Sequence, residues 1–183
     1  MNKAVCVLFG FALLFASDAF AQSIWSANAA TGVPNFLSTG DIKTTTVDTT
    51  IHGRGVRPRM TSEGTGTSFV YIPVTAPQGS NFACVGLRAM DTAADGGTMR
   101  AEFWRQPRNA NAGPAVLLGA VSSVNAAGDG FQFQQAAFGA QVINYNLFTY
   151  YIRLNMYHQP SAAGAIASVI ALDVSLSQYC ATF

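Results

Sequence analysis

The chain has 183 residues, a formal net charge of +1 and 10% charged side chains, against about 25% in an average soluble domain. This near-neutral balance argues against the strongly basic face that nucleic-acid binding requires. Hydrophobic residues make up 50% of the chain, which is enough to bury the core of a single domain of this size.

The N-terminus, residues 1–21, has the parts of a cleavable secretory signal. Lys3 gives a basic start, residues 5–16 are almost wholly apolar, and residues 19–21 (Ala-Phe-Ala) predict cleavage before Gln22. The apolar run is shorter than the roughly 20 residues of a membrane-spanning helix; an uncleaved N-terminal anchor is the alternative. We therefore expect an exported protein, periplasmic or extracellular, without a stable membrane span.

Residues 22–66 contain many Thr and Gly residues and only widely spaced apolar side chains. This composition predicts an extended, partly disordered N-terminal segment with one or two short strands, one of them near residues 45–52. The Gly and Pro content of residues 53–66 predicts a loop. The folded domain is accordingly expected over residues 67–183.

From residue 68 onward, β-branched and alternating runs separated by polar turns predict a series of strands. Residues 147–157 give the clearest pattern, because the even-numbered positions are apolar and the odd-numbered positions are mostly polar. A period of two cannot occupy one stripe of a helix. The pattern predicts an all-β fold, an antiparallel, jelly-roll-like β-sandwich. A short helix in one of the Ala-rich runs is the alternative. The expected strands are 68–74, 82–90, 99–106, 115–124, 131–138, 147–157 and 165–176.

Two cysteines follow the signal, Cys84 and Cys180. An isolated pair in an oxidising compartment usually forms a disulfide. Closing so long a loop would stabilise the fold by about 4–5 kcal/mol, less any strain. The alternatives are two buried free thiols, or a catalytic thiol that would need His52 or His158 as its base.

The order of elements resembles a group of bacterial exported β-sandwich proteins that have no assigned function. The resemblance covers about residues 68–175 and implies a sandwich without supplying any chemistry. The group has Asp-Asn before the Tyr-rich strand, where this chain has residues 143–146 (Ile-Asn-Tyr-Asn), so a role for that acid is in doubt. The shared motifs are Pro77-Gln78-Gly79, Asp91, Phe103-Trp104-Arg105, Val121-Ser122-Ser123, residues 150–154 (YYIRL) and residues 168–172 (SVIAL).

The sequence contains no recognisable catalytic or metal-binding constellation. We therefore expect no catalytic residue, no metal site and no cofactor. His52 and His158 are too few for a zinc site and lie beside turn-forming residues. Asp91 and Asp95 share one turn, but the turn lacks the carboxylate density of a calcium loop. Glu102 is explained by an ion pair on a solvated sheet face.

Two weaker sites remain as binding hypotheses. Trp104, Tyr151 and Tyr157 fall on the polar faces of two strands, where aromatic rings could stack on sugars. The competing interpretation, which we favour at this point, is that the second sheet or a loop covers these rings. Arg54, Arg57 and Arg59 form the densest run of charge and suit phosphate, a sulfated glycan or an acidic partner. A solvated loop is the simpler interpretation of that run.

The primary expectation is therefore a non-catalytic, exported β-sandwich with a structural or protein-interaction role at the cell exterior. Low charge and unpaired sheet edges favour self-association in this hypothesis, with another copy of the chain, or a cell-surface protein or glycan, as partner. The alternative is a module that binds carbohydrate or another small ligand through the aromatic sheet face.

Overall fold

The computed structural model describes residues 23–34, 39–40, 43–50, 56–63, 66–91, 98–123, 132–158 and 168–181. The predicted signal lies outside these residues. The described strands are β1 (Ile24–Asn28), β2 (Val33–Pro34), β3 (Thr39–Gly40), β4 (Lys43–Thr50), β5 (Val56–Glu63), β6 (Gly66–Pro73), β7 (Asn81–Asp91), β8 (Thr98–Pro107), β9 (Val116–Ser122), β10 (Gln132–Val142), β11 (Phe148–His158) and β12 (Ser168–Ser177).

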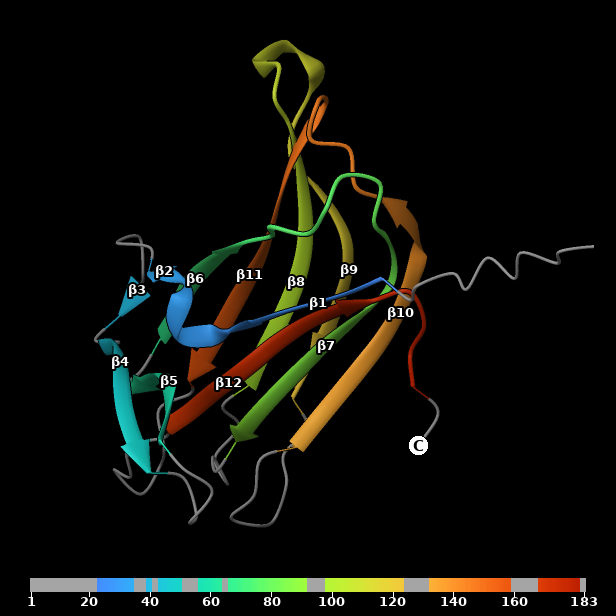
Figure 1. The fold of residues 1–183 in the computed structure, drawn as a ribbon. Helices are drawn as coiled ribbons and strands as arrows, with labels where there is room; N and C mark the ends of the chain where they lie inside the picture. The colour runs from blue at the N-terminus through green and yellow to red at the C-terminus, as the bar shows by residue number, and fades with distance from the viewer. Residues whose placement is uncertain are drawn as a thin grey trace, which may run out of the picture.

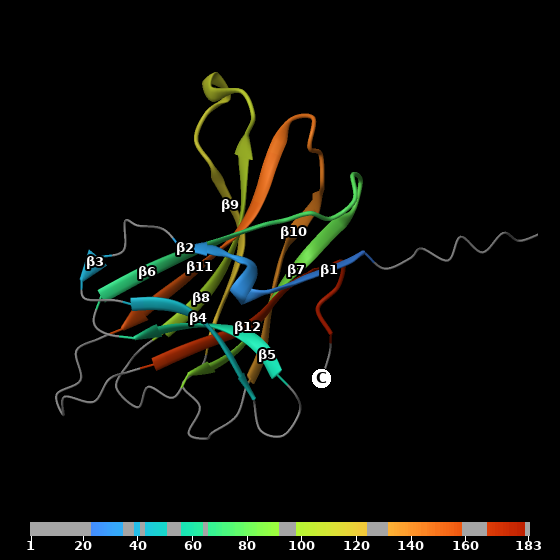
Figure 2. The same cartoon turned by 60° about the vertical axis from the view of Figure 1, so that its left-hand side comes forward.

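The strands form two antiparallel sheets that pack face to face (Figure 1). Sheet A has the order β10-β7-β12-β5-β4, and β1 also pairs with β12. Sheet B has the order β2-β6-β11-β8-β9, and β3 also pairs with β6. The second view shows the two layers from the side (Figure 2).

The chain passes repeatedly from one sheet to the other, since β5 and β7 lie in sheet A while β6 and β8 lie in sheet B. The same alternation continues from β10 through β11 to β12. Such crossings between two antiparallel sheets are typical of a jelly roll. The predicted antiparallel, jelly-roll-like β-sandwich is therefore confirmed.

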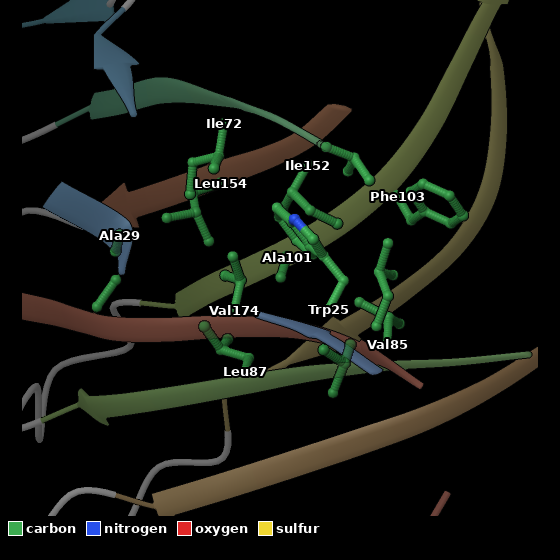
Figure 3. Packing of buried hydrophobic residues seen from close by; sticks show 14 of the residues in the cluster. Trp25, Ala29, Ile72, Val85, Leu87, Ala101, Phe103, Ile152, Leu154 and Val174 are labelled. Carbon is green, nitrogen blue, oxygen red and sulfur yellow. The ribbon is translucent and has the colours of Figure 1, made fainter. Parts of the chain in front are cut away.

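The hydrophobic core fills the space between the sheets (Figure 3). Sheet B contributes Phe103 and Ile152, which are fully buried, and sheet A contributes Leu87 and Val174. These side chains come from alternate positions of their strands, so each strand gives its other face to the outside. The outer face of sheet B therefore carries the polar and aromatic side chains that alternate with the buried ones.

The sandwich begins before residue 67, because strands within the segment 22–66 are hydrogen-bonded into both sheets. Trp25 of β1 is buried in the core, and its Nε1 donates to Thr75 Oγ1 at 3.3 Å. The predicted loop over 53–66 is wrong where β5 forms. β5 pairs with β4 along its whole length, but with β12 only at residues 60–63. Pro58 therefore lies beyond the β12 pairing, where a missing N–H breaks no ladder on that side.

A disulfide joins Cys84 of β7 to Cys180, which follows β12, with an S–S distance of 2.03 Å and a Cα–Cα distance of 5.2 Å. The predicted pairing is confirmed. Beside the bridge, the Ala181 amide donates to Gln135 Oε1 of β10 at 2.9 Å. The helices in the described residues are single 3-10 turns, and neither is long or apolar enough to cross a membrane.

Candidate functional site

β11 sorts its side chains to two faces as the sequence predicts. Tyr150, Ile152, Leu154 and Met156 are buried in the core. The intervening side chains point out of the sandwich, on the outer face of sheet B, and are half-buried or exposed. They are Thr149, Tyr151, Arg153, Asn155 and Tyr157.

Strand register decides which side chains meet on this face. β11 is the central strand, with β6 on one side and β8 on the other. Residues far apart in the sequence become direct cross-strand neighbours in this way, such as Arg153 and Glu102, which are 51 positions apart, at the spacing where side-chain pairs interact. The rows across β6, β11 and β8 are Pro73–Tyr151–Trp104, Tyr71–Arg153–Glu102, Phe69–Asn155–Arg100 and Thr67–Tyr157–Thr98.

Three aromatic rings form a continuous row over these three strands. Tyr71 and Tyr151 have their ring centroids 5.6 Å apart and tilted by 54°. Tyr151 and Trp104 have parallel rings, 5° apart in plane and 6.5 Å between centroids. All three side chains are half-buried rather than covered by sheet A, because they point away from it. Of the two coverings expected from sequence, a second sheet or a loop, the sheet is therefore wrong for this row.

Tyr157 lies apart from the aromatic row, although it shares the face. It is 39% exposed and stands opposite Thr67 and Thr98. Six positions of an extended strand separate it from Tyr151, which is about 20 Å. The structure thus brings together two of the three aromatic residues named from sequence. Tyr71 is the member that sequence reasoning missed, although the alternation of β6 gives the signal.

Glu102 is the centre of a charge cluster on the same face. Its side chain is 6% exposed, and its Oε2 accepts from Arg153 Nε at 2.7 Å and lies 2.6 Å from Arg153 Nη2. The indole Nε1 of Trp104 donates to the same oxygen at 3.0 Å. Arg100 Nε lies 3.3 Å from Oε1. The predicted ion pair forms, but the carboxylate is buried beneath its partners rather than solvated.

Arg153 ties the charge cluster to the aromatic rings. Its Cζ lies 4.6 Å from the Trp104 ring centroid and 5.3 Å from that of Phe69. Guanidinium groups at such distances are attracted to the ring face. Because Arg153 is also held by the carboxylate, Trp104 is fixed through both its N–H and one ring face.

The pKa of the Tyr151 phenol is raised above its usual 10.0, chiefly by burial and then by the neighbouring Tyr71 and Glu102, against a lowering by Arg153. The hydroxyl thus remains protonated, as a hydrogen-bond donor, throughout the neutral range. This hydroxyl forms no hydrogen bond with any of the described residues. The row therefore combines apolar ring surface with an available polar group.

Asn155 carries an acceptor without a partner on the same face. Its Oδ1 is shielded from solvent and receives no hydrogen bond. Leaving a buried acceptor unsatisfied costs about 1–3 kcal/mol. Its cross-strand neighbours are Phe69 and Arg100. Among the described residues of this face, Asn155 Oδ1 is the one buried side-chain polar atom that lacks a hydrogen bond.

The other predicted site residues lie elsewhere. Arg57 and Arg59 belong to β5 in sheet A, whereas the aromatic row belongs to sheet B. Arg54, His52 and Asp95 fall outside the described residues. Asp91 ends β7 and His158 ends β11. Within the described part of the chain, no group of three metal-ligating side chains occurs.

No protein-family model and no curated protein sequence matches the chain. Solved structures do. The family 11 carbohydrate-binding module of Clostridium thermocellum, in complex with a β-1,3-1,4-mixed-linked tetrasaccharide, has a TM-score of 0.51 at 9% identity, over 85% of this chain and 96% of that one.

Two larger proteins contain the same fold. The CBM22-1–GH10 modules of Clostridium thermocellum endo-1,4-β-D-xylanase 10B, complexed with xylohexaose, match with a TM-score of 0.52 at 10% identity, over 88% of this chain. The enzymatically active domain of tailspike protein 4 from bacteriophage CBA120 matches with 0.51 at 13% identity, over 82%. This chain spans only 28% and 20% of those two chains. At these identities, the likeness establishes the β-sandwich fold.

The comparisons correct two expectations from sequence. The resemblance to exported β-sandwich proteins is confirmed for the fold. The proteins of that group have no assigned function, whereas solved structures that share the fold include carbohydrate-binding modules. The primary hypothesis of a structural, self-associating protein is wrong, because carbohydrate-binding modules recur among the structures with this fold. These findings support the alternative drawn from sequence, a module that binds carbohydrate or another small ligand, better than the primary hypothesis.

Proposed function

We propose that the chain is a non-catalytic carbohydrate-binding module whose ligand lies on the outer face of sheet B. The observation that carries this proposal is the aromatic row of Tyr71, Tyr151 and Trp104 across three adjacent strands. Aromatic rings pack well against the apolar C–H faces of sugars, and a sheet holds their backbones rigidly.

The dimensions of the row suit an oligosaccharide. Neighbouring strands lie about 4.8 Å apart, so the backbones that carry these three residues span about 10 Å across the sheet. That distance exceeds the length of one pyranose ring. A glycan lying across the strands would therefore meet more than one of the three rings.

Polar groups beside the row supply hydrogen bonds to sugar hydroxyls. Tyr151 offers a phenol that stays protonated at neutral pH, and Arg100 has a side chain that is 46% exposed. Binding sites for small ligands typically combine apolar surface with a few such polar groups. Together these groups would set the orientation of a sugar stacked on the rings.

A binding role suits this face better than glycoside hydrolysis. Hydrolysis requires two carboxyl groups on either side of the scissile bond, separated by about 5–9.5 Å. Among the described residues of this face, Glu102 has the one carboxylate. It is buried under two arginines and an indole. It holds side chains in place and does not face a ligand.

The fold neighbours support the proposal at the level of module size. This chain covers 96% of the family 11 module, which was solved in complex with a tetrasaccharide. We also propose that the protein is exported, to the periplasm or the exterior. The disulfide supports this location, because such bonds persist in oxidising compartments.

Affinity gel electrophoresis tests the proposal. Wild-type protein is run through gels containing mixed-linkage β-glucan or xylan, and in parallel is applied to a broad glycan array. Tyr151→Ala removes the central ring of the row and should weaken binding about tenfold, which corresponds to about 1.4 kcal/mol. Tyr179→Ala is the matched control, because Tyr179 is 65% exposed and follows β12 of sheet A.

The two variants separate the outcomes. Retention of full affinity by Tyr151→Ala would remove the aromatic row from the site. Wild-type protein that binds no glycan in the gels or on the array would refute the proposed function. An equal loss in Tyr179→Ala would also count against the proposed face.

A further inference from the structure

The charges on the outer face of sheet B do not balance. Among its described residues, Glu102 is the one anion, whereas Arg100 and Arg153 are both cations. Arg153 directs two nitrogens at the carboxylate, at 2.6 and 2.7 Å, and its side chain is 27% exposed. One arginine thus suffices to pair the buried carboxylate, and the second brings a surplus positive charge.

Arg100 is the loosely held member of the cluster. It meets Glu102 through Nε alone, at 3.3 Å, and its side chain is 46% exposed. Its two terminal amino groups form no hydrogen bond or ion pair with any of the described residues. If Arg100 turned toward a ligand, Glu102 would keep its bonds to Arg153 and Trp104. The arginine can therefore change partner without leaving the carboxylate unpaired.

Asn155 places a second unused group at the same point. It is the direct cross-strand neighbour of Arg100, and its Oδ1 is shielded without a hydrogen bond. A buried acceptor normally has a hydrogen-bond donor as its partner. The corner thus offers guanidinium N–H donors and, directly beside them, a carbonyl oxygen that needs one.

We propose that Arg100, together with Asn155, makes the site selective for a glycan that carries an anionic sugar unit. This inference rests on the proposed function and names its ligand class. A carboxylate or sulfate ester accepts two N–H bonds from the planar guanidinium fork. Asn155 Oδ1 is shielded from solvent in the unliganded protein; as Arg100 turns toward the ligand, this oxygen becomes accessible to a neighbouring hydroxyl of the same sugar, which donates to it. The remaining sugar rings lie on the aromatic row, where Trp104 and Tyr151 are four positions along their strands from Arg100 and Asn155, about 13 Å away.

Isothermal titration with matched pairs of oligosaccharides tests the inference on the full disulfide-bonded protein. The first pair is hexagalacturonic acid and its methyl ester, in which methyl groups cap the carboxylates and remove their charge. The second pair is a sulfated carrageenan oligomer and its desulfated form. The two pairs distinguish a carboxylate from a sulfate ester. We expect the wild-type protein to bind the anionic member of one pair about tenfold more tightly than its neutral twin.

Arg100→Gln should reduce that preference to less than about twofold, because the anionic member loses more affinity than its neutral twin when the guanidinium is removed. Arg100→Lys retains the charge without the fork and should keep part of the preference. Arg88→Gln is the matched control, since Arg88 is 45% exposed and faces Asp173 at 3.9 Å on sheet A. The control should keep the full preference.

The outcomes distinguish this inference from the proposed function. Equal affinity for both members of each pair, or a preference that survives Arg100→Gln, overturns the inference. Glycan binding that excludes all anionic oligomers overturns it as well, while the proposed function stands. Absence of binding to every glycan overturns both.

Discussion

Replacing Glu102 by Gln tests whether the charge cluster organises the candidate site. The substitution keeps the length of the side chain but removes the charge that Arg153 and Arg100 share. The amide also presents two N–H groups where the carboxylate only accepts, so one of them would oppose the guanidinium. Trp104 and Arg153 would then lose the group that fixes them.

The contacts set the size of the expected effect. Breaking a fully buried ion pair by removing one partner costs about 3–5 kcal/mol. Here the carboxylate is nearly buried at 6% exposure, but the arginine side chains are 27% and 46% exposed and can rehydrate. Since exposed pairs contribute little, we expect a loss of about 2 kcal/mol of unfolding free energy, between these two limits.

Urea-induced unfolding, followed by tryptophan fluorescence, measures this loss. In a domain of about 150–250 residues, about 2 kcal/mol corresponds to a melting temperature lowered by about 4–8 °C. Arg88→Gln, in the more exposed pair on sheet A, should cost less than about 1 kcal/mol. A Glu102→Gln protein within about 0.5 kcal/mol of wild type, which is the range of ordinary surface substitutions, would show that the cluster is not a structural unit.

Three further predictions concern the fold. Replacing Cys84 and Cys180 together by Ser should lower the unfolding free energy by about 4–5 kcal/mol, measured against wild type in urea; a loss below about 1 kcal/mol would contradict the loop-closure argument. Gly32→Ala should cost about 1–3 kcal/mol by overpacking, because an added Cβ would lie 2.8 Å from Ile72 Cγ1, and an unchanged thermal midpoint would refute this contact. The raised pKa of Tyr151 means that its contribution to stability is complete below pH 10.0 and is lost as the pH rises through the folded-state value; the unfolding free energy of Tyr151→Phe should therefore fall less than that of wild type in that range.

The strands of the sandwich were largely predictable because their signal is local. The alternation of residues 147–157 corresponds to β11, with even-numbered positions inside and odd-numbered positions outside. β5 was missed because Pro58 and the neighbouring glycines indicate a loop. Its pairing with β4 and, in part, with β12 is a tertiary effect that local composition cannot express.

The candidate site was only partly predictable because it depends on register between distant strands. Trp104 and Tyr151 were identified as outward-facing, but their stacking depends on the pairing of β8 with β11. The burial of Glu102 requires Arg153, which lies 51 positions further along the chain. Tyr71 is absent from the predicted site because the prediction for the run 68–74 assigns a strand but no outward face.

The position of the bound glycan tests the central claim most directly, and the two tryptophans of the chain report on it. Trp104 lies on the outer face of sheet B, whereas Trp25 is buried in the core with its N–H bonded to Thr75. In a ¹H–¹⁵N correlation spectrum recorded during titration with a glycan that binds, the indole signal of Trp104 should shift, together with the amides of Tyr71 and Tyr151. The Trp25 indole signal should stay in place. Shifts confined to sheet A, or to the Trp25 signal, would contradict the proposed site.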